Sequence, residues 1–184
     1  MNKKLNWILI LGGAVIVVCL IACVGAALLI KFLPGINKNS IENSSLKVGE
    51  AAPDFELASL NGESIKLSQF KGQPVLLTFS ASWCPDCRLE APLLQDLHES
   101  RPELVVLLVD LKETPDVARG FADEFGFTFP VLLDRDGSIS KLYQILAIPT
   151  GLFIDSDGII RAKIIERVTP ELLEEKLLLI GIQP

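Results

Sequence analysis

The chain has 184 residues, 49% of them hydrophobic, with 17 basic side chains, 23 acidic side chains and one histidine. This length suits one domain with its own hydrophobic core, so we expect a single folded domain. The first 38 residues hold four lysines and no acid, which leaves the rest of the chain with a net charge of −10. An acidic chain without a basic run argues against nucleic acid as a partner.

An apolar block without charge or proline occupies residues 7–30. Its 24 residues exceed the roughly 20 that a helix needs to cross a bilayer. Lys3 and Lys4 precede the block and Lys31 ends it, so we predict a single transmembrane anchor at 1–31. The lysines after the block weaken the charge asymmetry that orients such a segment. The very short amino-terminal tail of an uncleaved signal would place the rest of the chain on the extracytoplasmic side of the cytoplasmic membrane. The residues before Cys23 also resemble a lipoprotein cleavage box, and whether the anchor is cleaved or lipidated there stays open.

After the block the composition changes to Asn, Ser, Gly and Lys, which predicts a flexible tether at 32–47 and a folded domain at 48–184. Strands and helices then alternate along the domain. We expect strands at 55–57, 64–67, 74–80, 104–109, 131–133, 150–154 and 159–165. We expect helices at 84–98, 115–126, 139–145 and 170–179, and turns at 61–62, 69–72, 134–137 and 156–158. This order predicts an α/β fold, a central mixed sheet flanked by helices.

Two cysteines, Cys84 and Cys87, stand at the start of the first long helix, directly after a buried strand. Pro85 fits the first turn of that helix, where its missing amide hydrogen costs nothing. The free amides and the dipole of a helix start stabilise a thiolate, so Cys84 is the expected nucleophile. Cys87, one turn later, can attack a mixed disulfide and release the substrate, so it is the expected resolving thiol.

Other roles for the two cysteines fit less well. A structural disulfide that closes so short a loop stabilises a fold little, and Trp83 beside it gives the aromatic cover of a reactive site. Haem attachment needs a histidine where Arg88 stands, and His98 alone cannot complete a zinc site with the two cysteines. We therefore expect neither a metal nor a cofactor.

Three motifs occur in order: Gly-Glu-Ala-Ala-Pro-Asp-Phe at 49–55, Trp-Cys-Pro-Asp-Cys at 83–87 and Ala-Ile-Pro-Thr at 147–150. Together they resemble the membrane-anchored, thioredoxin-like oxidoreductases of the TlpA/ResA type, over about residues 48–180. The resemblance implies a thioredoxin fold and dithiol-disulfide exchange with protein substrates, apocytochrome c among them. Reduction of such substrates also requires a membrane thiol donor as a partner.

The resemblance implies roles for further residues. Pro149 would be a cis-proline that faces the dithiol, and the backbone of Ile148 would pair with an extended substrate segment. Trp83 and Pro85, which flank Cys84, are assigned with them to substrate binding. Glu90 matches an acidic residue near the dithiol in ResA-like proteins, where a buried carboxylate can carry protons and oppose thiolate formation. The alternative for Glu90 is a solvated glutamate in the first turns of the helix.

The chain departs from the family between its cysteines, where Pro85 and Asp86 replace Glu-Pro or Pro-Pro. We hypothesise that the charge of Asp86 disfavours the thiolate and makes the pair more reducing.

Two other functions compete with this reading. The first is a thiol peroxidase, because this chain shares the Ala-Pro-Asp-Phe segment with the peroxiredoxins, but their active site has Pro and Thr or Ser where Leu77 and Ala81 stand here. A copper-delivery protein of thioredoxin fold would use cysteines three residues apart and a distant histidine, whereas here the spacing is two and His98 follows in the same helix.

Overall fold

The computed structural model describes residues 46–183. The predicted anchor at 1–31, and all but the last two residues of the tether at 32–47, lie outside these residues. In the described part, no helix is both long and apolar enough to cross a membrane.

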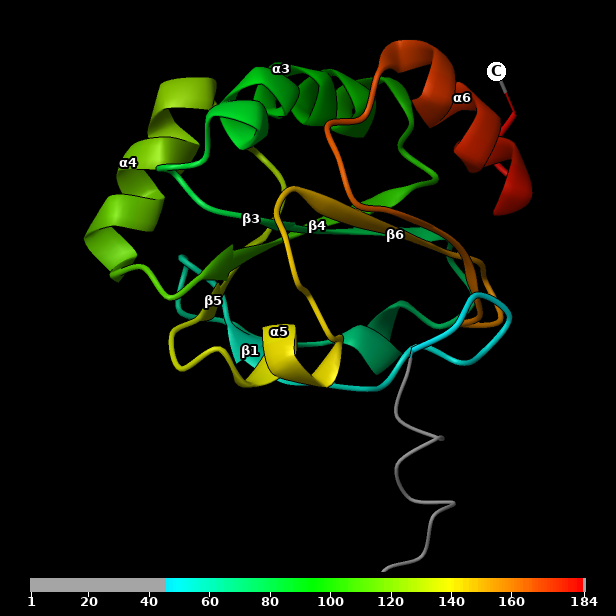
Figure 1. Cartoon of the computed structure of the whole chain (residues 1–184), viewed down its shortest axis with the longest axis horizontal. Coiled ribbons are helices and arrows are strands. Elements are labelled where there is room, and N and C mark those ends of the chain that lie inside the picture. The colour runs from blue at the N-terminus through cyan, green and yellow to red at the C-terminus, as the bar shows by residue number, and fades with distance from the viewer. Residues whose placement is uncertain (1–45, 184) are drawn as a thin grey trace, which may run out of the picture. The chain divides into compact units, whose positions relative to one another are not determined.

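A five-stranded mixed sheet forms the centre of the fold, in the order β5-β4-β3-β6-β7 (Figure 1). β3 pairs in parallel with β4, and β4 with β5, whereas β6 is antiparallel to both β3 and β7. Every residue of β3 is buried, as its run of apolar residues predicts. The strand bounds are β3 Val75–Ser80, β4 Val105–Leu111, β5 Val131–Asp134, β6 Thr150–Ile154 and β7 Ile160–Ile164.

Three helices cover one face of the sheet, and a smaller layer covers the other (Figure 1). The first face carries α3 Pro85–Ser100, α4 Pro115–Phe125 and α6 Pro170–Leu179. The second face carries the β1–β2 hairpin (Glu56–Ala58 and Ser64–Lys66), the 3-10 turn η1 (Leu67–Phe70) and α5 (Ser138–Leu142). Each face has its own buried apolar cluster, so the α/β fold with a flanked mixed sheet is confirmed.

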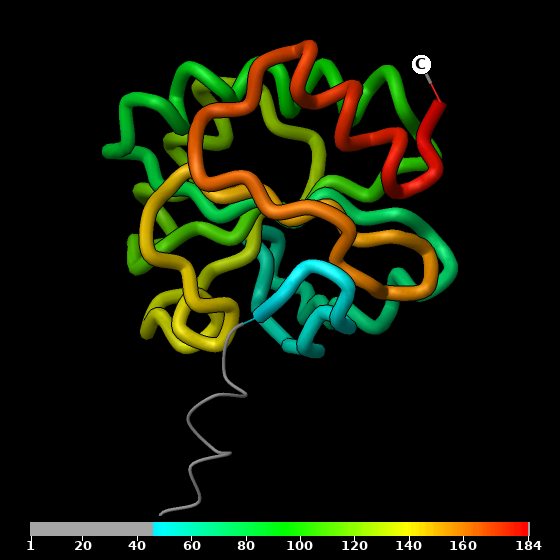
Figure 2. Tube along the Cα trace, turned by 45° about the vertical axis from the view of Figure 1, so that its right-hand side comes forward, coloured from blue at the N-terminus to red at the C-terminus, as the bar shows by residue number. Residues whose placement is uncertain are grey.

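The segment between β7 and α6 rises from the sheet to the layer of α3, where α6 then lies beside α3 (Figure 2). Leu173 and Leu177 of α6 share a buried cluster with Leu94 and Leu97 of α3. This packing fixes the end of the domain against the helix that carries the cysteines.

The structure corrects several local predictions. The helix expected at 139–145 ends at Leu142, because Gln144 adopts a left-handed φ of 49°. The turn expected at 69–72 begins earlier, as η1. The N-caps of two helices differ. Thr114, at the start of α4, makes no side-chain capping hydrogen bond, whereas the Oγ1 of Thr169, at the start of α6, accepts a hydrogen bond from the amide of Leu172.

Candidate active site: the dithiol at the start of α3

Cys84 is the N-cap residue of α3, and Pro85 is the first residue of that helix. The Sγ atom of Cys84 accepts a hydrogen bond from the amide of Cys87 at 3.3 Å. Cys84 and Cys87 form a disulfide whose Cα atoms are 5.2 Å apart. In the reduced state the same amide would face a thiolate on Cys84, because free amides at a helix start stabilise a negative charge.

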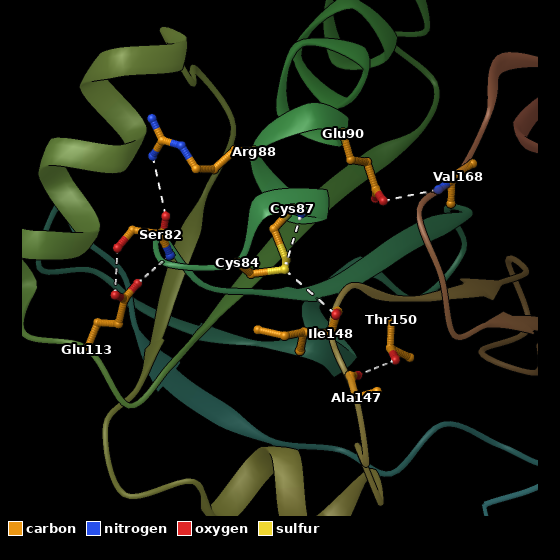
Figure 3. The surroundings of a disulfide bond; sticks show 10 residues. All are labelled: Ser82, Cys84, Cys87, Arg88, Glu90, Glu113, Ala147, Ile148, Thr150 and Val168. Carbon is orange, nitrogen blue, oxygen red and sulfur yellow. Dashed lines mark hydrogen bonds between the residues drawn. A yellow bond between two sulfur atoms is a disulfide. The ribbon is translucent and has the colours of Figure 1, made fainter.

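A cis peptide bond joins Ile148 to Pro149, as the resemblance implied. It lies directly before β6, where the Oγ1 of Thr150 donates a hydrogen bond to the carbonyl of Ala147 at 2.7 Å and closes the turn. The carbonyl oxygen of Ile148 lies 3.7 Å from the Sγ of Cys84 (Figure 3). The turn before β6 therefore faces the first cysteine, although the two are far apart in the sequence.

Both cysteines are buried, with Cys84 4% and Cys87 2% exposed, whereas their apolar neighbours reach solvent. Trp83 is 67% exposed and Leu146 is 92% exposed. They line a groove of about 220 Å³ together with Leu111, Ile145, Ala147 and Ile148. The sequence pointed to Trp83 and Ile148 but not to Leu111 or Leu146, because the groove forms where three segments that are far apart in the sequence meet.

Glu90 lies one turn beyond Cys87 on α3 and is 2% exposed, so the buried alternative holds and the solvated one is wrong. Its Oε2 accepts a hydrogen bond from the amide of Val168 at 3.2 Å (Figure 3). Burial raises the pKa of Glu90 to about 7, against the opposing effects of that hydrogen bond and of the Arg167 charge. A carboxyl group with this pKa can take up or release a proton near neutral pH.

Acidic residues on the other side of the dithiol were missed from the sequence. Glu113, in the loop after β4, accepts hydrogen bonds from Ser82, two residues before Cys84. Asp110, at the end of β4, is fully buried. A predicted parallel pairing of β3 and β4 could have pointed to these two residues, because it places the loops that follow both strands at the same edge of the sheet.

The arrangement bears on the two competing functions. His98 lies eleven residues beyond Cys87 on the same helix, about 16 Å along its axis, and packs edge-on against Phe129. The structure therefore does not bring His98 to the cysteines. Leu77 and Ala81, where a peroxidase needs Pro and a hydroxyl residue, are fully buried apolar side chains.

Comparison with known proteins agrees with this geometry. Residues 48–163 match the AhpC/TSA family. The thiol-disulfide oxidoreductase ResA of Bacillus thuringiensis subsp. konkukian is 33% identical over 138 residues, which cover 74% of this chain and 80% of ResA. StoA of Bacillus subtilis is 32% identical with a TM-score of 0.60, covering 69% of this chain and 98% of StoA. A thiol:disulfide interchange protein DsbE of Chlorobium tepidum is 30% identical with a TM-score of 0.69, covering 74% of this chain and 100% of its own.

A thioredoxin-like fold with a disulfide at a helix start, opposite a cis-proline, defines a thiol-disulfide oxidoreductase. The chain belongs to the AhpC/TSA family of redoxins, and its relatives include the ResA oxidoreductases that its motifs resemble.

Proposed function

We propose that the protein is a membrane-tethered, extracytoplasmic reductant of protein disulfides, with Cys84 as the nucleophile and Cys87 as the resolving thiol. The observation that carries this proposal is the position of Cys84. Its Sγ caps α3 and faces the carbonyl of Ile148, one of the residues that line the groove.

The exchange reaction follows from this asymmetry. The Cys84 thiolate attacks one sulfur of a substrate disulfide, and the other substrate sulfur leaves as a thiolate and takes a proton. Cys87 then loses its proton and attacks the Sγ of Cys84, which releases the second substrate thiol and forms the Cys84–Cys87 disulfide. Two electrons pass from the protein to the substrate. Glu90, one turn from Cys87, is suited to accept the Cys87 proton.

The groove suggests how a substrate would bind. An extended segment can lie along the backbone of Ile148 as an added strand, with its apolar side chains against Trp83 and Leu146. Pro85 lies exposed in the first turn of α3, at the border of this path. We therefore propose unfolded, disulfide-bonded polypeptides as the substrates.

The direction of electron flow is inferred from the charges around the dithiol. Asp86 is exposed between the two cysteines, and Glu90 is buried one turn later, so both carboxyl groups disfavour a thiolate when they are ionised. A less stable thiolate makes the reduced form the better electron donor.

The reduction potential of the Cys84–Cys87 pair tests this direction. A midpoint near about −270 mV, measured against glutathione or dithiothreitol buffers, is expected for a reductant. A midpoint near about −120 mV would instead make the protein an oxidant and would overturn the proposal.

The anchor predicted at 1–31 would place the domain in an oxidising compartment, where disulfides form readily and a dedicated reductase is useful. Apocytochrome c, whose haem-attachment cysteines must be reduced, is the substrate that we propose by analogy with ResA. A membrane thiol donor would return electrons to the pair. The test is whether the reduced protein opens the disulfide of an oxidised peptide with the Cys-X-X-Cys-His sequence, and whether Cys84→Ser abolishes this.

A further inference from the structure

Ser82, in the turn between β3 and Cys84, is held through all of its hydrogen-bonding groups. Its amide donates to Glu113 Oε2 at 2.7 Å, and its Oγ donates to Glu113 Oε1 at 2.7 Å. Its carbonyl oxygen accepts a hydrogen bond from Arg88 Nη1 at 3.3 Å. Figure 3 shows Ser82 between these two side chains. We call Ser82, Glu113 and Arg88 the Ser82 clamp.

Glu113 reaches Ser82 because of the sheet register. Ser80 pairs with Asp110 across β3 and β4, so the loops that follow both strands leave the same edge together. The two hydrogen bonds that Glu113 accepts join residues 31 positions apart. Because a carboxylate accepts both bonds in a bidentate way, the turn before Cys84 has little freedom to rotate.

Asp110, in β4, is a neighbour of Glu113. It is fully buried, and within residues 46–183 neither of its carboxyl oxygens has a hydrogen-bond donor. Burial, and then the neighbouring Glu113 carboxyl, raise the pKa of Asp110 to about 8. Asp110 therefore keeps its proton at neutral pH and adds no negative charge beside Glu113.

Arg88 brings α4 into the same arrangement. Its Nη2 atom pairs with Glu124 of α4, and its guanidinium carbon lies 5.3 Å from the ring centre of Phe125 and 5.9 Å from that of Phe121. Arg88 directly follows Cys87, so the side chain that holds the Ser82 carbonyl comes from the first turns of α3 itself. The turn is therefore fixed to α3 and α4 through Arg88 and to the loop after β4 through Glu113.

We propose that Glu113 and Arg88 are positioning residues for disulfide exchange, because by holding Ser82 they fix the turn that presents Trp83 and Cys84 to a polypeptide substrate. This inference rests on the proposed role of Cys84 as the attacking thiol. Attack requires the incoming sulfur to line up with the substrate S–S bond. A polypeptide seated along Ile148 cannot reorient to follow a displaced Cys84, whereas a small symmetric disulfide can approach from any direction. The clamp should therefore matter for polypeptides and little for small disulfides.

The test compares two reactions of the reduced full-length protein in detergent. One is the second-order rate with a peptide that carries one internal disulfide, and the other is the rate with the small disulfide 5,5′-dithiobis(2-nitrobenzoate). For Glu113→Ala we expect the peptide rate to fall about tenfold and the small-disulfide rate to stay within about twofold. Glu113→Gln keeps an acceptor for the Ser82 amide and an amide group for its Oγ, so it should restore the peptide rate to within about twofold of the original.

A control and a milder variant complete the design. Glu175→Ala removes an exposed acid that pairs with Lys176 on α6, and it should change neither rate. Ser82→Ala removes one of the three hydrogen bonds and should lower the peptide rate about threefold, which tests the proposal even where Glu113→Ala fails to fold.

Two results would overturn the inference. One is an unchanged peptide rate in both Glu113→Ala and Ser82→Ala. The other is an equal fall of both rates, since this would mean that Glu113 acts on the reactivity of the thiol and not on its orientation. A separate result would contradict the proposed role of Cys84 as the attacking thiol. In that case Cys84→Ser would still react with the peptide.

Discussion

Asp86 is exposed in the first turn of α3, between the two cysteines. We expect Asp86→Asn to make the dithiol less reducing, raising its midpoint potential by about 5 to 20 mV. The reason is that an exposed charge at a helix start contributes about 0.3 to 1 kcal/mol to a neighbouring ion. Redox titration against glutathione buffers measures the change.

The matched control for this variant is Asp96→Asn. Asp96 is also exposed on α3 but lies ten residues further on, about 15 Å along the helix axis, and its loss should leave the potential unchanged. An Asp86→Asn midpoint that is unchanged or more negative would contradict the role we assign to Asp86.

Glu90 gives a pH-dependent prediction. Its pKa is raised from 4.5 to about 7 by burial, so the folded protein holds a proton that the unfolded chain loses. The stability that neutral Glu90 provides is fully present below about pH 4.5 and is lost as the pH rises through 7. The glutamine in Glu90→Gln cannot ionise. The free energy of unfolding of this variant, minus that of the original protein, should therefore increase as the pH rises, by up to about 3 kcal/mol at pH 8.

Urea unfolding between pH 5 and pH 8 measures this gain. Glu103→Gln, which changes an exposed glutamate in the loop before β4, should show no such trend. A difference between Glu90→Gln and the original protein that is constant with pH would mean that Glu90 is already ionised in the fold.

At the level of the elements, the sequence predicts the secondary structure best where one local pattern of residues determines it. The apolar run of β3, and the proline that opens α3, were enough to place Cys84 at a helix start. The end of α5 could not be predicted, because the left-handed backbone conformation after it falls on Gln144 and not on a glycine, the residue that usually marks such a position. The burial of Glu90 was undecided, because it depends on Val168, 78 positions away. The contact between Glu113 and Ser82 depends in the same way on strand register.

The start of α6 is a helix cap that can be tested alone. Thr169 accepts the hydrogen bond of the Leu172 amide, and the adjacent Val168 amide binds Glu90. We expect Thr169→Ala to lower the free energy of unfolding by about 1 kcal/mol, and Thr169→Ser, which keeps the hydroxyl, to change it much less. The midpoint of urea unfolding measures both. Equal losses in the two variants would show that the threonine methyl group, and not the cap, carries the effect.

For the whole molecule, the described domain has two buried clusters of its own, one on each face of the sheet. We therefore expect a chain of residues 46–184 to fold alone and to reduce a disulfide peptide within about twofold of the rate of the full chain in detergent. The full chain should sediment with membranes, and the shortened chain should not. A full chain that stays in the supernatant would contradict the proposed anchor at 1–31.

The burial of the dithiol has a consequence for which proteins it serves. Because Cys84 is 4% and Cys87 2% exposed, and the groove beside them is lined by Trp83, Leu146 and Ile148, we expect a partner disulfide to reach Cys84 on a narrow, flexible strand. A disulfide held in the interior of a finished domain cannot be delivered in that way. The enzyme would thus distinguish immature chains from mature ones by shape alone, and could share a compartment with folded, disulfide-bonded proteins without dismantling them.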